Sequence, residues 1–120
     1  MAGIEHRDFS APDEVRSPDK TSVEVVNVGD GQIARCTFQP GWKWSDCVKP
    51  VVGTDTCQAE HIGYQISGRI HVEHADGTTA DIVPGEVYRI APGHNAWVLG
   101  NEPAVGVEFQ SAAVYAKAKA

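Results

Sequence analysis

The chain has 120 residues and a mass of 12.9 kDa, which leaves room for one folded domain. Hydrophobic residues make up 42% and charged residues 22%, which is typical of globular proteins and argues against disorder. Sixteen acidic against ten basic residues give a net charge of −6, so we expect no nucleic-acid partner. The sequence has no apolar run as long as a membrane span and no secretion signal at its start, so we expect no membrane partner and a cytoplasmic location.

Residues 1–22 are polar and contain two prolines, and we expect them to form an arm that lies on the surface or crosses to a partner. The following region, 23–110, is predicted to be a single β-barrel domain, and 111–120 an alanine- and lysine-rich tail. Within the domain, β-branched or alternating runs bounded by glycine and proline predict strands at 23–28, 31–38, 57–66, 69–75, 78–83, 86–91, 95–99 and 104–109.

Turn signals separate these runs, and Asp76-Gly77 is the strongest of them. Residues 42–56 have no clean period and are expected to form a long irregular loop, of a kind that is usually functional. Short strands at such regular spacing predict an antiparallel sandwich or barrel.

The stretch HIGYQISGRIHV, the Asp-Gly turn and the stretch VPGEVYRIAPGHNAWV resemble the core of a cupin. This resemblance implies an all-β fold, the cupin-type double-stranded β-helix, which is an antiparallel jelly-roll barrel. We expect six to eight strands, with Gly68, Gly85 and Gly93 in turns. The segments PGWKWSDCVKP, GTDTC, HIGY, SGR and PGHNAW are similar to small stand-alone bacterial cupins, a subgroup that leaves the function open.

The first cupin motif, aligned on Gly68, places its glutamate slot at His61 and its two histidine slots at Asp55 and Cys57. Its initial glycine slot falls on Lys49, which is a mismatch. The histidines that the motif expects are therefore absent, so the resemblance alone does not imply that this chain has the metal site of cupins.

The second motif fits at Gly85 and Gly93. Its proline, histidine and asparagine slots fall on Ala91, Ala96 and Gly100, and Pro92, His94 and Asn101 lie close by. The histidine slot of this motif is therefore empty, and His94 lies two residues before it.

Cys57 and His61 are four residues apart on an expected strand, so alternation places both on one face. His94 follows a Pro-Gly turn that the barrel topology would bring to the same mouth, and Cys47 lies where relatives of the subgroup often have histidine. Imidazole and thiolate are ligands for zinc, nickel, iron or copper, so we predict a divalent transition metal bound by His61, Cys57, His94 and Cys47.

Glu60 and Asp55 lie close in sequence to His61 and Cys57, and we predict an acid–base or supporting role for them. Alternatives remain open: Cys57 as a small buried hydrophobe, His94 as a turn histidine, and Cys47 with Cys57 as a redox-sensing disulfide. Cys36 is mid-strand and is expected in the core.

A barrel of this size holds one small ligand at most, and aromatic walls suit such a pocket. The candidates are Trp42, Trp44, Tyr64 and Trp97, with core packing as the alternative for each and the favoured interpretation for Tyr64.

Together these features favour a metal-dependent enzyme of oxygenase, isomerase or lyase type that acts on a small organic molecule. One alternative is a non-catalytic cupin that senses a small ligand or a metal, and another is a structural dimer module with a degenerate site. We also expect a homodimer, because the β-branched strand 23–28 next to the arm leaves an edge that benefits from packing or exchange of terminal strands.

Overall fold

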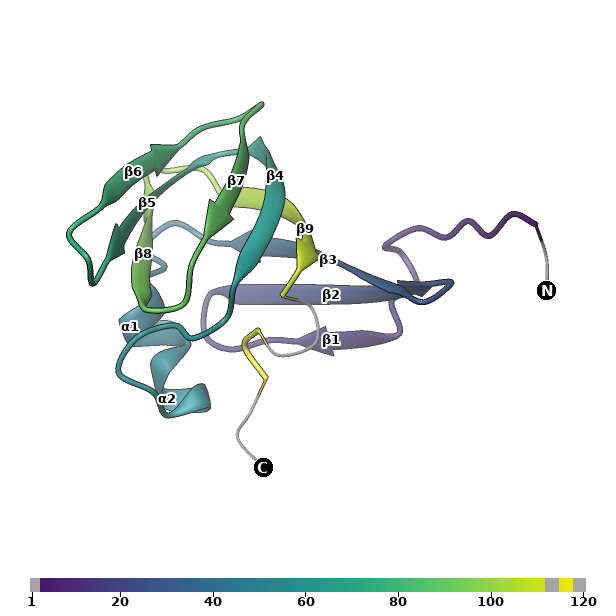
Figure 1. The fold of residues 1–120 in the computed structure, drawn as a ribbon, viewed down its shortest axis with the longest axis horizontal. Helices are drawn as coiled ribbons and strands as arrows, with labels where there is room; N and C mark the ends of the chain where they lie inside the picture. The colour runs from purple at the N-terminus through teal and green to yellow at the C-terminus, as the bar shows by residue number, and fades with distance from the viewer. Residues whose placement is uncertain (1–2, 112–114, 118–120) are drawn as a thin grey trace.

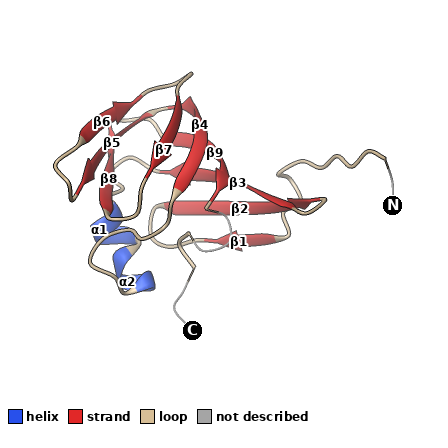
Figure 2. Cartoon of the chain, viewed as in Figure 1, coloured by secondary structure: helices blue, strands red, loops and turns tan. Residues whose placement is uncertain are grey.

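A computed structural model describes residues 3–111 and 115–117. It is built almost entirely of antiparallel strands (Figure 2). The strands are β1 (Glu14–Arg16), β2 (Thr21–Val28), β3 (Gly31–Phe38), β4 (His61–Ser67), β5 (Arg69–His74), β6 (Thr79–Ile82), β7 (Val87–Ile90), β8 (His94–Leu99) and β9 (Ala104–Gln110). Two short helices, α1 (Trp44–Cys47) and α2 (Lys49–Val52), connect β3 to β4.

The strands form two sheets that enclose the core (Figure 1). The larger sheet has the order β1-β2-β3-β9-β4-β7, and the smaller has the order β6-β5-β8. Neighbours in space are often distant in sequence, as when β9 pairs with both β3 and β4. This interleaving of early and late strands is the jelly-roll arrangement, and it confirms the expected all-β antiparallel fold.

Inward and outward side chains alternate along the strands. In β4, His61, Gly63 and Gln65 face the interior and the residues between them face outward. In β9, Ala104, Gly106 and Glu108 are the buried positions. Period-two alternation therefore fixes which side chains of these two strands reach the interior.

The turns fall at the predicted glycines. Gly85 and Gly93 have φ of 92° and 101°, values that glycine adopts without strain. Gly68, between β4 and β5, has φ of 69°, and a Cβ there would overlap the backbone of Pro103. The chain can therefore pass from the larger sheet to the smaller at this position only with glycine.

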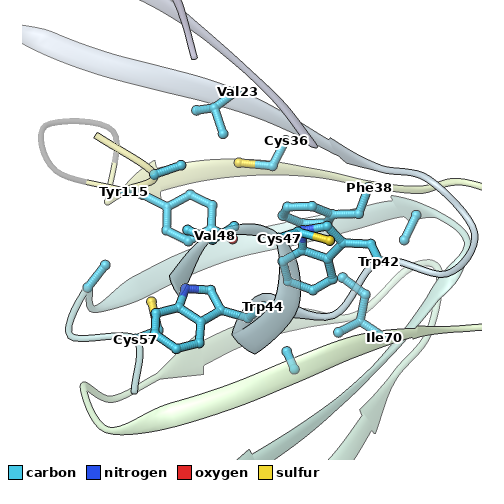
Figure 3. Close-up of a cluster of buried hydrophobic side chains, with 14 of the residues drawn as sticks. Val23, Cys36, Phe38, Trp42, Trp44, Cys47, Val48, Cys57, Ile70 and Tyr115 are labelled. Carbon is cyan, nitrogen blue, oxygen red and sulfur yellow. The ribbon is translucent and has the colours of Figure 1, made fainter. Parts of the chain in front are cut away.

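The core lies between the sheets and is closed at one end by α1 (Figure 3). Phe38 stacks on Trp42 with ring centroids 4.1 Å apart, and the Trp42 indole N–H donates to the Thr21 hydroxyl at 2.9 Å. Cys36 is buried on β3, as expected for a core cysteine.

Three features differ from the sequence-based expectations. The described residues contain nine strands where six to eight were expected, because residues 14–16 of the expected arm pair with β2 as β1. The segment 42–56 contains α1 and α2, since short helices satisfy backbone groups that an irregular loop would leave open. The extended run from residue 57 becomes strand only at His61, and before it Cys57 forms an isolated bridge with His94. Among the described residues, no helix is long and apolar enough to cross a membrane.

Candidate metal centre

Cys57, His61 and His94 converge inside one end of the barrel. Their ligand atoms all lie within 4.8 Å of one another, and the three residues are only 3–4% exposed. Cys57 Sγ lies 3.6 Å from His61 Nε2, and the two imidazole centroids are 5.0 Å apart. Two nitrogen donors and one sulfur donor thus share one buried site.

The backbone fixes Cys57 beside His94. The amide of Cys57 donates to the His94 carbonyl at 2.8 Å, and the amide of Gly93 donates to the Cys57 carbonyl at 2.7 Å. This bridge joins the segment before β4 to the start of β8, so the Pro92-Gly93 turn places both ligand residues. His61 reaches the same point from the first position of β4.

A second set of residues orients the His61 ring. Its Nδ1–H donates to Glu108 Oε1 at 2.6 Å. The other Glu108 oxygen accepts the Tyr88 hydroxyl at 2.8 Å, and the Ser111 hydroxyl donates to Oε1. Because Nδ1 is engaged, Nε2 is the nitrogen that His61 turns towards Cys57, an arrangement common around bound metals.

His94 is oriented in the same way by backbone. Its Nδ1–H donates to the Ala91 carbonyl at 2.7 Å, which leaves Nε2 for the site. Both imidazoles therefore present the same nitrogen as a ligand, and this donor set fits a tetrahedral or five-coordinate transition metal.

The electrostatics of the site favour a charged sulfur. Burial would raise the pKa of the Cys57 thiol, but hydrogen bonds with His61 and His94 lower that pKa to about 6. Burial would likewise lower the pKa of His61, but the Glu108 carboxylate raises it to about 10. The pKa of Glu108 falls despite its burial, because the His61 charge and three hydrogen bonds stabilise the carboxylate. Without metal the three groups form a thiolate–imidazolium–carboxylate chain.

A glycine on β4 leaves the space in which the Tyr88 side chain reaches Glu108. A Cβ on Gly63 would lie 2.7 Å from the Tyr88 hydroxyl oxygen and 2.7 Å from the Val107 carbonyl oxygen. Burial and the neighbouring Glu108 charge raise the pKa of Tyr88, so its hydroxyl keeps its proton and remains a donor. A residue without a side chain thus allows the hydroxyl to reach Glu108.

Two hollows adjoin the site. The interior one, about 40 Å³ in volume, lies between the sheets, and His61, His94 and Glu108 are among its lining residues. The outer one, about 300 Å³, is bordered by Cys57 and by the rim residues Thr54 and Lys117. The two histidines therefore border the small interior cavity, and Cys57 borders the larger outer pocket.

Trp44 and Tyr115 line both hollows. The Tyr115 ring packs edge-on against His61, with centroids 4.7 Å apart, and the Arg16 guanidinium donates to its backbone carbonyl at 2.8 Å. The indole N–H of Trp44 is buried and, among the described residues, has no hydrogen-bond partner.

The sequence matches no protein-family model and no curated protein sequence. Solved structures do match. The polyketide cyclase RemF from Streptomyces resistomycificus superposes with a TM-score of 0.60 and 16% identity, over 88% of this chain and 77% of that one. A cupin-like protein from Thermotoga maritima gives a TM-score of 0.52 at 17% identity, over 80% of this chain and 71% of that one. A cupin domain from Bordetella pertussis gives a TM-score of 0.50 at 16% identity, over 75% of this chain and 91% of that one.

The chain has a cupin fold. The resemblance seen in the sequence is confirmed at the level of the fold by these cupin structures. Within this fold, Cys57 and His61 meet His94 from the start of β8.

The other predicted site residues lie elsewhere. The Cys47 sulfur is buried in α1 and lies 3.9 Å from an Asp19 carboxylate oxygen, away from the three converging ligands. All three cysteines are free thiols, so Cys47 and Cys57 form no disulfide in this structure. The Asp55 carboxylate is fully exposed, and Glu60 pairs with Arg89 at 2.7 Å on the outside of the barrel.

The four aromatic candidates divide into two pairs. Trp42 and Trp44 line the interior cavity of the cupin barrel. Trp97 faces away from it and contacts His71, with ring centroids 4.6 Å apart, while Tyr64 is exposed on the outer face of β4. Alternation explains the placements of Tyr64 and Trp97, because each side chain occupies an outward position of its strand.

Sequence reasoning did not find Glu108, Tyr88 and Tyr115. The signal for Glu108 was a carboxylate at an inward position of the otherwise apolar run AVGVEF, where a buried charge needs a partner. Tyr88 and Tyr115 gave no comparable signal, because a tyrosine is also common as plain core.

Proposed function

We propose that this cupin binds a divalent transition metal through Cys57, His61 and His94 and acts on a small organic molecule there. The single observation that carries the proposal is the convergence of three ligand atoms whose imidazoles are both oriented through Nδ1. The polyketide cyclase with the same fold supports an enzymatic role. Three free thiols support a reducing, cytoplasmic environment.

The mixed nitrogen and sulfur donors select for zinc, nickel, iron or copper over magnesium or calcium. Three protein ligands leave at least one position for water or substrate. A metal bound there supplies Lewis-acid or oxygen-activating chemistry to a molecule beside it.

The residues around the site would prepare it for that chemistry. Glu108 holds His61 in one orientation and one tautomer, and Tyr88 and Ser111 hold Glu108. Trp44 and Tyr115 keep bulk water from the ligands and offer the free indole N–H to an oxygen atom of the substrate. A pocket of about 300 Å³ bordered by Cys57 has the volume of a small-molecule site.

The proposal is tested by elemental analysis of protein purified without a histidine tag. We expect close to one transition-metal ion per chain in wild type, and loss of that ion in His61→Ala and Cys57→Ser with the β-sheet spectrum retained. Cys47→Ser is the matched control, because it removes a buried thiol outside the cluster. Full occupancy in His61→Ala, or metal-free wild type from metal-supplemented medium, would contradict the proposal.

A non-catalytic, metal-sensing role is the second candidate, and the size of the interior cavity favours it. A volume of about 40 Å³ admits only a few waters, which leaves little room for a substrate beside the ligands on that side. The two roles differ in whether the metal has an accessible position. Addition of azide to the cobalt-substituted protein should change its visible spectrum if the enzymatic role holds, and an unchanged spectrum would favour the sensor.

A further inference from the structure

Cys57, His61 and Glu108 are arranged in the order that a nucleophilic thiol requires. The Cys57 sulfur lies 3.6 Å from His61 Nε2, and His61 Nδ1–H donates to Glu108 Oε1 at 2.6 Å. In such an arrangement the imidazole takes the proton of the thiol, and the carboxylate fixes the imidazole. The geometry is therefore that of a Cys-His-acid triad as well as that of a metal centre.

The carboxylate of Glu108, the third member of the triad, is itself held from two sides. The Tyr88 hydroxyl donates to its Oε2 at 2.8 Å, and the Ser111 hydroxyl donates to its Oε1. The two ring nitrogens of His61 thus have fixed directions, with Nδ1 towards Glu108 and Nε2 towards the sulfur. Groups that are already in place need no reorganisation when the proton moves, and this lowers the barrier to the reaction.

The Cys57 thiol also borders a space that a small molecule can occupy. The outer pocket of about 300 Å³ has Cys57 in its lining, beside the rings of Trp44 and Tyr115. Among the described residues that line it there is one cation, Lys117, and no carboxylate, although the chain has sixteen acidic residues. A carbonyl oxygen that gains negative charge in this pocket therefore meets no repulsion from the lining.

His61 reaches Cys57 from the interior side of the barrel. It lines the interior cavity of about 40 Å³ and is absent from the described lining of the outer pocket. His61 can therefore accept the proton of the thiol, but it is not placed to protonate a leaving group across the outer pocket. Such a leaving group must depart as a stable anion, which a thiolate or a phenolate does and an amine does not.

We propose that the metal-free protein has a second activity, the hydrolysis of small thioesters and aryl esters with Cys57 as nucleophile. The Cys57 sulfur forms a bond to the acyl carbon while its proton passes to His61 Nε2 and then to solvent. The bond from the acyl carbon to the leaving group breaks, and a thiolate or phenolate departs. Water then attacks the acyl carbon, the carbon–sulfur bond breaks, and one proton of the water returns to the Cys57 sulfur as the acid is released.

This activity goes beyond the proposed metal function and uses the same sulfur. The electron pair that would bind a metal is the one that attacks the carbonyl, so an ion held by Cys57, His61 and His94 would block the hydrolysis. The two functions therefore belong to different states of the protein, and each can be measured without the other.

The experiment mixes the chelated full chain with p-nitrophenyl acetate and records both p-nitrophenolate release and the mass of the protein. Wild type should release one equivalent per chain in an initial burst, gain one acetyl group and then continue to turn over. Its acylation should be about a hundredfold faster than that of free cysteine, which is the order that a positioned base contributes. p-Nitroacetanilide, whose leaving group is an amine, should not react.

Variants of the triad identify the nucleophile and the base. Cys57→Ser should lose the burst, and His61→Gln should slow acylation by about a hundredfold. Cys47→Ser is the matched control, because it removes a buried thiol outside the cluster, and it should keep the burst.

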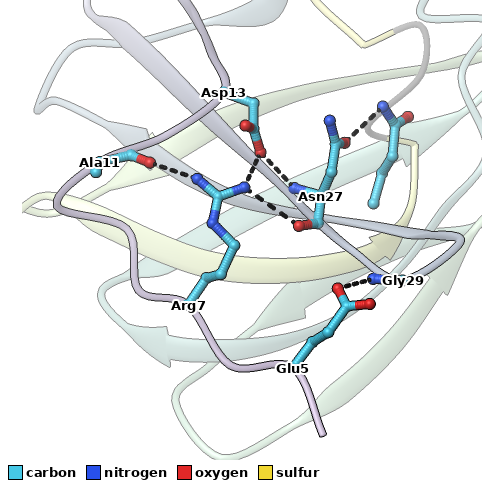
Figure 4. Close-up of polar contacts among 7 residues, drawn as sticks. Glu5, Arg7, Ala11, Asp13, Asn27 and Gly29 are labelled. Carbon is cyan, nitrogen blue, oxygen red and sulfur yellow. Dashed lines mark hydrogen bonds and ion pairs between the residues drawn. The ribbon is translucent and has the colours of Figure 1, made fainter. Parts of the chain in front are cut away.

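Two arginine variants test whether the outer pocket is the route to the thiol. Arg16→Met releases the Tyr115 carbonyl at the border of the pocket and should speed acylation by about tenfold. Arg7→Met is the matched control. Arg7 pairs with Asp13 and donates to the Asn27 carbonyl in the N-terminal arm, none of which lines the outer pocket (Figure 4). Its loss should leave the acylation rate unchanged.

The inference is overturned by a wild type that is not acylated, by acylation that persists in Cys57→Ser, by an unchanged rate in His61→Gln, or by equal acceleration in the two arginine variants. Because the assay uses chelated protein, its result is separate from that of elemental analysis. An acylated wild type that binds no metal contradicts only the metal proposal, and a metal-binding wild type that is not acylated after chelation contradicts only this inference.

Discussion

Replacement of Glu108 by glutamine should move a proton from His61 to Cys57 in the metal-free protein. The substitution keeps the shape of the side chain and removes the charge that raises the pKa of His61 to about 10. Burial then dominates both groups, so the pKa of His61 falls and that of Cys57 rises from about 6 towards or above the ordinary thiol value.

The magnitude follows from these values. At pH 7.5 a thiol with a pKa near 6 is more than about nine-tenths thiolate, whereas a thiol with a pKa near 9 is less than about a tenth thiolate. A change of about three pKa units corresponds to about 4 kcal/mol in the relative stability of the two protonation states.

Ultraviolet absorbance of the thiolate, followed against pH after chelation of metal, measures this shift. Wild type should show a transition near pH 6 that Cys57→Ser lacks and that Glu108→Gln moves upward by two units or more. Glu60→Gln is the matched control, since that carboxylate precedes His61 in sequence but pairs with Arg89 outside the barrel. An unshifted transition in Glu108→Gln would refute the account of the site.

Three further results are expected. Metal affinity should rise about tenfold per pH unit between pH 6 and 10, because metal binding displaces the one proton that His61 carries in that range. Competition with a chelating dye measures this affinity, and an affinity independent of pH would contradict the expectation. Gly63→Ala should lower the free energy of unfolding by about 1–3 kcal/mol in urea titrations, because its Cβ meets Tyr88 and Val107, and an unchanged midpoint would argue against that packing. Arg16→Met should speed the reaction of Cys57 with a thiol reagent about tenfold by releasing the Tyr115 carbonyl, whereas an unchanged rate would show that this contact does not shield the site.

Much of the fold was predictable because its signals are local. Glycine- and proline-containing turns and period-two runs placed most of the strands, and Gly68, Gly85 and Gly93 adopt the positive φ expected of turn glycines. Cys57 and His61 do meet, but not by alternation along one strand, because Cys57 lies before β4 and its backbone bridge to His94 holds it in place.

The rest depended on contacts between distant segments. Glu108 is 47 residues from His61, and only the pairing of β9 with β4 brings the two together. Cys47 could not be placed because α1 and α2 interrupt the chain before β4, and the direction of a side chain on a short helical turn is not given by strand alternation. Tyr115 lies beyond the last strand, where neither period nor motif applied.

The contact between Arg16 and Tyr115 joins residues 99 positions apart. Because Tyr115 packs on His61, the environment of the candidate ligands depends on segments near both ends of the chain. A truncation that removes Arg16 or Tyr115 is therefore expected to alter the protection of the ligands, even though every strand that carries them is retained. Affinity tags and fusion partners at these ends are accordingly best separated from the chain by long flexible spacers. Metal content is best compared before and after the tag is removed.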